Sequence, residues 1–88
     1  WYDEEVAKLE TWADDLRLSL EAELRELEQR IREARTAARA AATLQEKLAG
    51  QRELKRLEEQ RTARRRALFE AQDEIAARRD GLIEAVER

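Results

Sequence analysis

The spacing of the apolar residues constrains this chain more than any other feature. Apolar or small residues recur every three or four positions, which places them along one face of an α-helix. In the first half these positions are Tyr2, Val6, Leu9, Ala13, Leu16, Leu20, Leu24, Leu27, Ile31, Ala34, Ala38 and Ala41. In the second half the same spacing runs through Leu57, Arg61, Arg64, Leu68, Ala71, Ile75, Arg78 and Leu82, with arginines at three of these seam positions, and Leu44, Leu48 and Leu54 lead into it. No segment alternates apolar and polar residues as a half-buried strand does, so the pattern predicts an all-α coiled coil.

The composition agrees with this class. The 88 residues include no Pro and two Gly, and 44% of them are charged while 5% are aromatic. A chain this rich in charged residues and this poor in aromatic residues cannot form a thick globular core. The core is therefore expected to be a stripe between helices. A disordered chain can have a similar composition, but it lacks sustained apolar periodicity.

The position of the turn is less obvious, because an alanine-rich stretch runs through residues 37–42 without a helix breaker. Thr43 followed by Glu46 matches a capping box, in which the two side chains satisfy the free amides at a helix start. We therefore predict an antiparallel two-helix coiled-coil hairpin, with helices at about 3–41 and 44–87 and a turn near residues 41–44.

The sequence is also compatible with two other arrangements. Gly50 could end the first helix as a left-handed cap, although the two arms would then be unequal. An interior helix glycine costs only about 1 kcal/mol, which a long helix tolerates. The other alternative is one unbroken helix that dimerises.

Close packing near the predicted turn would follow if small residues faced large ones. We expect Ala34, Ala38 and Ala41 to lie near Leu44, Leu48 and Leu54. The three arginines of the seam are expected to extend their guanidinium groups to facing carboxylates such as Glu23 or Glu5. A site for an anion is the alternative role for these arginines.

Exposed faces carry acid-before-base pairs at a spacing of four residues, which stabilise a helix. These are Glu4 with Lys8, Glu21 with Arg25, Glu26 with Arg30, Glu28 with Arg32, and Glu74 with Arg78.

The residues needed for catalysis are missing. The chain has no Cys or His, its one serine is Ser19, and no phosphate-binding or metalloprotease motif occurs. We expect no enzymatic activity, no cofactor and no metal site. No apolar run is long enough to span a bilayer, which predicts a cytoplasmic protein. The chain begins at Trp1 and contains no Met, which indicates a segment of a larger protein.

Charge is distributed unevenly along the predicted hairpin. Residues 30–66 contain twelve basic and five acidic residues, a net charge of +7, whereas the remaining residues carry a net charge of −10. A turn near Thr43 makes the tip basic, and a basic tip suits contact with a phosphate backbone. The candidate contact residues are Arg32, Arg35, Arg39, Lys47, Arg52, Lys55 and Arg56. The alternative is that these charges mainly pair with carboxylates of the two helices.

The acidic end carries apolar side chains beyond those that a two-helix seam needs. They are Trp1, Trp12, Leu18, Phe69 and Ile83. Such a patch suggests docking onto the rest of the parent chain or formation of a homodimer. The alternative is a broad apolar base within a single hairpin.

Four strings of residues resemble a known family. They are EEVAKLETWADDL at 4–16, TLQEKL at 43–48, RRRALFEAQDEI at 64–75 and RDGLI at 79–83. Together they resemble the C-terminal region of bacterial Swi/Snf-type ATP-dependent helicase-like proteins, over nearly the whole chain. The resemblance implies that the ATPase motor lies elsewhere in the parent protein, because none of its catalytic motifs occurs here. It also implies a DNA-related setting.

Two functions follow as expectations. The first is a non-catalytic coiled-coil arm of a helicase-like DNA translocase, acting as a structural spacer and protein-interaction element. The second is an arm that binds a nucleic-acid backbone through its basic tip.

Overall fold

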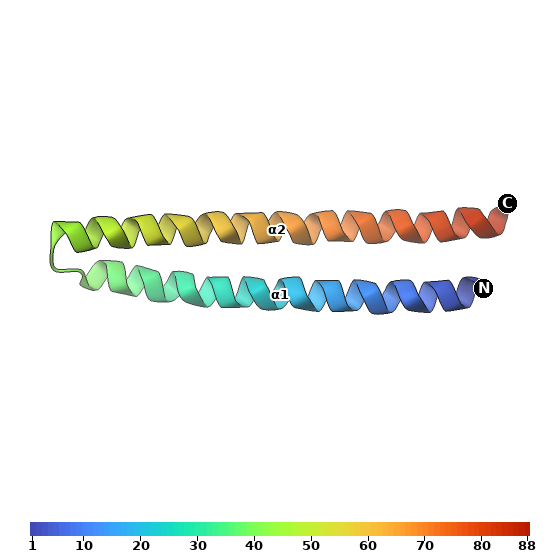
Figure 1. Cartoon of the computed structure of the whole chain (residues 1–88), viewed down its shortest axis with the longest axis horizontal. Helices are drawn as coiled ribbons and strands as arrows, with labels where there is room; N and C mark the ends of the chain where they lie inside the picture. Colours follow the sequence, from blue (N-terminus) through green and yellow to red (C-terminus); the bar gives the residue numbers. More distant parts are fainter.

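The computed structural model describes all 88 residues as two long helices joined by a short turn. Helix α1 spans Tyr2–Ala40 and helix α2 spans Leu44–Glu87. The helices run antiparallel and side by side, so both termini lie at the same end, the base of the hairpin (Figure 1). The Cα atoms extend over 67 × 16 × 10 Å. The predicted all-α hairpin is confirmed, and the alternative of one unbroken helix is wrong.

The turn lies where the capping box predicted it. Ala41 and Thr43 have extended backbones, which ends α1 and prepares the start of α2. Thr43 Oγ1 accepts a hydrogen bond from the Glu46 amide at 3.1 Å, and Glu46 Oε2 accepts one from the Ala42 amide at 3.1 Å. Both side chains thus satisfy amides that have no partner within a helix. Gly50 lies inside α2 without a positive φ, so the alternative turn at Gly50 is wrong.

The core is a narrow stripe along the seam between the helices. Three buried residues of the stripe, Leu27, Ile31 and Leu57, form a cluster against which Ala34 and Leu54 pack. Six of the 88 residues are buried in all, and they are Leu9, Leu20, Leu27, Ile31, Leu57 and Ala71. Burial of one such leucine or isoleucine stabilises the fold by about 1.5–3 kcal/mol, so these few contacts set the register of the hairpin.

The helices approach each other closely near the turn, but not as predicted. A Cβ atom added to Gly50 would lie 3.2 Å from Ala38 Cβ, so the contact there is glycine against alanine. Leu54 packs as expected, whereas Leu44 and Leu48 are 71% and 48% exposed, so their predicted packing against the alanines is wrong. Gly50 takes the inward position, and Leu48, two residues earlier, lies about 200° away around the helix.

Two of the seam arginines differ in their contacts. Arg64 Nε lies 3.0 Å from Glu23 Oε2, which is the pairing that the sequence predicted. Arg61 forms no ion pair, and its Nε atom is buried without a hydrogen-bond partner. About half of each side chain of the Arg64–Glu23 pair remains exposed, although the Glu23 Oε2 atom itself is buried and accepts no hydrogen bond.

Arg78, the third seam arginine, binds within its own helix and stacks on α1. Its guanidinium lies 2.9 Å from Glu74 Oε1 and 4.3 Å from the centroid of the Trp12 ring. Glu5 instead forms an ion pair with Lys8 at 3.3 Å. The prediction that Glu5 would serve a seam arginine is therefore wrong.

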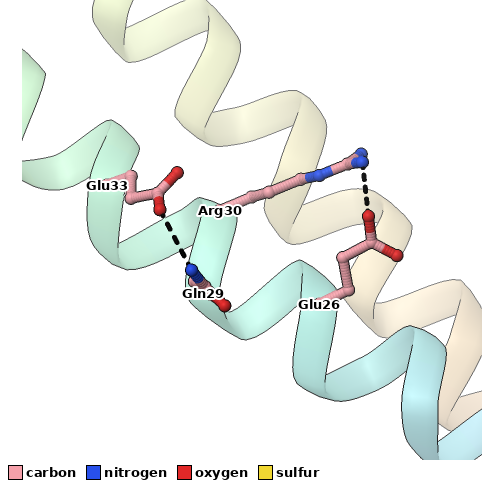
Figure 2. A network of polar contacts seen from close by, with 4 residues as sticks. All are labelled: Glu26, Gln29, Arg30 and Glu33. Carbon is pink, nitrogen blue, oxygen red and sulfur yellow. Dashed lines mark hydrogen bonds and ion pairs between the residues drawn. The ribbon is translucent and has the colours of Figure 1, made fainter.

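Two of the five predicted pairs at a spacing of four residues form. Arg30 lies 2.6 Å from Glu26, and Arg78 pairs with Glu74 (Figure 2 shows the first of these). Figure 2 also shows the Gln29 amide donating to Glu33 at 3.2 Å. The other three pairs do not form. Lys8 pairs with Glu5 of its own helix and Glu28 with Arg65 of α2, whereas Glu21 and Arg25 form no ion pair.

Candidate nucleic-acid interface

The tip of the hairpin, residues 36–57, lies beyond the last ion pair that joins the helices. That pair is Arg35 with Glu58, at 3.6 Å. The tip contains five basic and two acidic residues. Glu46 is held by the Ala42 amide in the capping box, and Glu53 is held by Arg56. The other basic side chains of the tip have no carboxylate partner, so the tip carries uncompensated positive charge.

The seven predicted contact residues fall into two groups. Arg35 pairs with Glu58, and Arg56 donates two hydrogen bonds to Glu53 at 2.9 and 2.6 Å. The other five residues form no ion pair and are exposed, and they are Arg32, Arg39, Lys47, Arg52 and Lys55. The alternative in which the basic residues mainly pair with carboxylates therefore describes Arg35 and Arg56, but not these five.

In the Glu53–Arg56 pair, a carboxylate of the same helix neutralises the charge of a basic residue of the tip. The hydrogen bond from Arg56, and then the charges of Arg56 and Arg30, lower the pKa of the Glu53 carboxyl. The same hydrogen bond and the charge of Glu53 raise the pKa of Arg56. Arg56 is thus engaged with a fixed anion and is less available to a ligand than an unpaired arginine.

The two edges of the seam near the tip differ in charge. One edge has a hollow lined by Arg30, Glu33, Ala34, Ala37, Glu53, Arg56 and Leu57, in which two cations face two carboxylates. The other edge has a hollow of about 370 Å³ lined by Arg35, Ala38, Arg39, Lys47, Gln51 and Leu54. No carboxylate lines the second hollow, which we call the cationic hollow.

The cationic hollow brings together three of the seven predicted contact residues, namely Arg35, Arg39 and Lys47. Gln51, which the prediction omitted, joins them from α2. Its spacing was the available signal, since Gln51 follows Lys47 by one helical turn just as Arg39 follows Arg35. Arg32, Arg52, Lys55 and Arg56 do not line this hollow.

The residues predicted for docking at the base do not form one patch. Trp12 is half-buried under Arg78 and lines a hollow of about 420 Å³ with Leu9 and Leu82. Leu18 and Phe69 are 55% and 66% exposed. Each precedes a buried residue by two positions, and therefore lies on the outward face of its own helix.

Trp1 and Ile83 lie at the open end of the hairpin, and both are exposed. Tyr2 and Val86 are exposed there as well. The exposed apolar surface of the base therefore comes from the ends of both helices, and Leu18 and Phe69 are separate from it.

No group of His, Cys, Asp and Glu side chains is arranged to hold a metal ion. Neither helix has a stretch that is long and apolar enough to cross a membrane.

The fold and the charge distribution define an antiparallel helical hairpin with an acidic base and a basic tip. No family model, curated protein or solved structure matches the chain.

Proposed function

We propose that this chain is a non-catalytic coiled-coil arm that acts as a structural spacer and protein-interaction element. The proposal includes that the arm belongs to a helicase-like DNA translocase, because the sequence resembles the C-terminal region of such proteins. The observation that carries it is the continuity of both helices over a hairpin 67 Å long, with both termini at the base. A two-helix hairpin with one stripe of core has no room for an enclosed active site. It holds its base and its tip at a constant separation.

Support for the interaction role comes from the base. Trp1, Tyr2, Ile83 and Val86 are exposed at the end where the chain enters and leaves the hairpin. Exposed apolar side chains of this kind favour contact with another protein surface. A partner there would leave the tip free to project.

The spacer role can be tested by the distance between two spin labels. The chain has no cysteine, so Glu4→Cys and Gln45→Cys give two unique labelling sites. Helix α1 is continuous from Glu4 to Ala40, and Gln45 follows directly after the turn, which predicts a single narrow distribution at about 55 Å, at 1.5 Å per residue. Samples diluted with unlabelled chain remove distances between molecules. A broad distribution would show a flexible hairpin and would contradict the spacer role.

The interaction role can be tested by replacing the apolar residues of the base. Joint substitution Trp1→Ser, Ile83→Ser and Val86→Ser is expected to leave the thermal unfolding midpoint nearly unchanged, because these side chains lie outside the core. A large fall in the midpoint would show that they stabilise the hairpin itself. They would then not be available for a partner.

A second candidate function is an arm that binds a nucleic-acid backbone. The specific observation in its favour is the group of five exposed basic residues without an ion pair, all in or beside the tip. Binding of this kind depends on phosphate charge and weakens steeply with salt.

Fluorescence anisotropy of labelled duplex DNA at several salt concentrations tests the second function. Replacing Arg39, Arg52 and Lys55 with Gln should weaken binding and reduce the salt dependence by about one counterion for each lost phosphate contact. The matched control replaces Arg25, Arg79 and Arg88, which carry the same charge outside the tip. Equal weakening by both sets would show that net charge, and not the tip, attracts DNA.

A further inference from the structure

We propose that the cationic hollow is a binding site for one phosphoryl group, held between the two helices by Arg35, Arg39, Lys47 and Gln51. This inference deepens the second candidate function, because a nucleic-acid backbone is one source of such a group. A free phosphate or pyrophosphate is another source with the same chemistry.

The four polar residues of the hollow come from both helices, and all four are hydrogen-bond donors. The two arginines of α1 are separated by one helical turn, and so are Lys47 and Gln51 of α2. Their side chains carry N–H donors, and the remaining residues that line the hollow are Ala38 and Leu54. Guanidinium, ammonium and amide donors around a small apolar floor match the oxygens of a phosphoryl group.

The opposite edge of the seam is the internal comparison. There, about one helical turn farther from the tip, two arginines face two glutamates across a hollow, and the Glu53–Arg56 hydrogen bonds are short. The cationic hollow has no such partner from its own lining. Arg35 reaches Glu58 at 3.6 Å without a hydrogen bond, and Glu46 is committed to the Ala42 amide. Repulsion among the three cations is therefore relieved when an anion enters.

The shape of the hollow depends on the close approach of the helices beside it. Ala38 forms part of its floor, and the neighbouring contact of Ala38 with Gly50 leaves no larger side chain to fill the space. Lys47 also lies at the end of the first turn of α2, where the helix dipole favours an anion.

The same region does not favour recognition of a base. No aromatic residue occurs between residues 30 and 66, so no ring is present to stack on an exposed base. The site is therefore expected to bind the phosphate of duplex DNA without preference for sequence.

The decisive experiment compares two isosteric substitutions that change the charge equally. Gln51→Glu places a carboxylate in the hollow, whereas Gln45→Glu places one on an exposed residue of the same helix outside it. Binding of the complete chain to labelled duplex DNA is measured by anisotropy. The thermal unfolding midpoint is measured with sodium pyrophosphate and with sodium chloride at matched ionic strength.

We expect Gln51→Glu to weaken DNA binding at least about tenfold, because a charge-assisted hydrogen bond is lost and a repulsive group is added. Gln45→Glu should weaken it by less than about threefold, since it acts only through the general field. Pyrophosphate should raise the unfolding midpoint of the unsubstituted chain and of Gln45→Glu, but not that of Gln51→Glu.

Other outcomes separate this site from the proposed function. Equal weakening of DNA binding by both substitutions, with no stabilisation by pyrophosphate, would overturn the site and leave backbone binding by the whole tip intact. Stabilisation by pyrophosphate without any DNA binding would support the site for a free phosphate and overturn the nucleic-acid function. Absence of both effects would overturn both.

A pair of double variants guards against misfolding as an explanation. Arg39→Gln with Lys47→Gln removes two charges from the hollow, and Arg52→Gln with Lys55→Gln removes two charges from the tip outside it. All four residues are exposed, so both variants should keep their helix content by circular dichroism. The first should weaken DNA binding more than the second, and the reverse order would overturn the site.

Discussion

The guanidinium carbon of Arg78 lies 4.3 Å from the centroid of the Trp12 ring, which joins α2 to α1 near the base of the hairpin. Arg78 occupies a seam position where a coiled coil usually has an apolar residue. Its guanidinium lies over the indole ring and also donates a hydrogen bond to Glu74 Oε1 at 2.9 Å. A charged residue can therefore replace an apolar one here without burial of its charge.

Replacing Arg78 with Gln should destabilise the hairpin through loss of this stacking. An exposed cation–π contact contributes about 0.5–1 kcal/mol, and the change in unfolding free energy should be of that size. A double-mutant cycle with Trp12→Leu, measured by urea denaturation, isolates the contact from the Arg78–Glu74 pair. Arg79→Gln is the control, because Arg79 forms no ion pair or ring contact. A coupling energy near zero would contradict the contact.

Replacing Thr43 with Ala should destabilise the turn. The hydroxyl accepts the amide of Glu46, and loss of an N-cap side chain costs about 1 kcal/mol. Thr36→Ala is a suitable control, since the Thr36 hydroxyl only bonds back to the Arg32 carbonyl within α1. Alanine is the better helix former there, so this control should be neutral or stabilising. Equal destabilisation by both changes in thermal unfolding would show that the capping box has no special role.

The local features of this chain could be predicted from sequence, because they depend on neighbouring residues. The heptad pattern predicted both helices, and the Thr43–Glu46 spacing predicted the turn. Ion pairs were harder, since an arginine can choose between partners at three or four residues and partners on the other helix. Glu28, for example, lies 3.7 Å from Arg65 of α2 instead of pairing with Arg32.

The cationic hollow depends on the register between the helices, which no single helix specifies. The basic residues of the tip were predicted as contacts, but their division between two edges was not. It follows from Gly50 lying against Ala38 and from Leu57 packing beside Ile31. A shift of one residue in this register would place Gln51 and Lys47 elsewhere relative to Arg39.

The pKa of Glu53 provides a test of the opposite edge of the tip. The pKa of its carboxyl should lie below the ordinary glutamate value, because Arg56 donates two hydrogen bonds to it. A lowered pKa in the folded state means that the interaction stabilises the hairpin above the unfolded pKa and is lost as the pH falls through the folded one. Carbon-detected NMR titration of the side-chain carboxyls measures this directly.

Arg56→Gln should move the Glu53 titration back toward the ordinary glutamate range. Arg52→Gln is the control, because Arg52 forms no ion pair with Glu53. An unchanged Glu53 titration in Arg56→Gln would show that the pair does not persist in solution.

The two glycines of α2 should respond in opposite ways to replacement by alanine. Glycine in a helix interior is about 1 kcal/mol less favourable than alanine, so each substitution gains the same intrinsic propensity. At Gly81 no atom lies within 4 Å of the added Cβ, and the gain should appear in full. At Gly50 the added Cβ would lie 3.2 Å from Ala38 Cβ and 3.3 Å from Ala38 Cα, so the helices must separate slightly.

Because one of those contacts is to the backbone, the strain cannot be relieved by rotation of a side chain. Gly81→Ala should therefore raise the thermal unfolding midpoint by several degrees, whereas Gly50→Ala should leave it unchanged or lower it. The double variant Gly50→Ala with Ala38→Gly restores the space between the helices. The helix propensity gained in α2 is then offset by the equal loss in α1, so its unfolding midpoint should return to that of the unsubstituted chain. A full gain from Gly50→Ala alone would mean that the helices do not approach closely at the tip, and the cationic hollow would lose its floor.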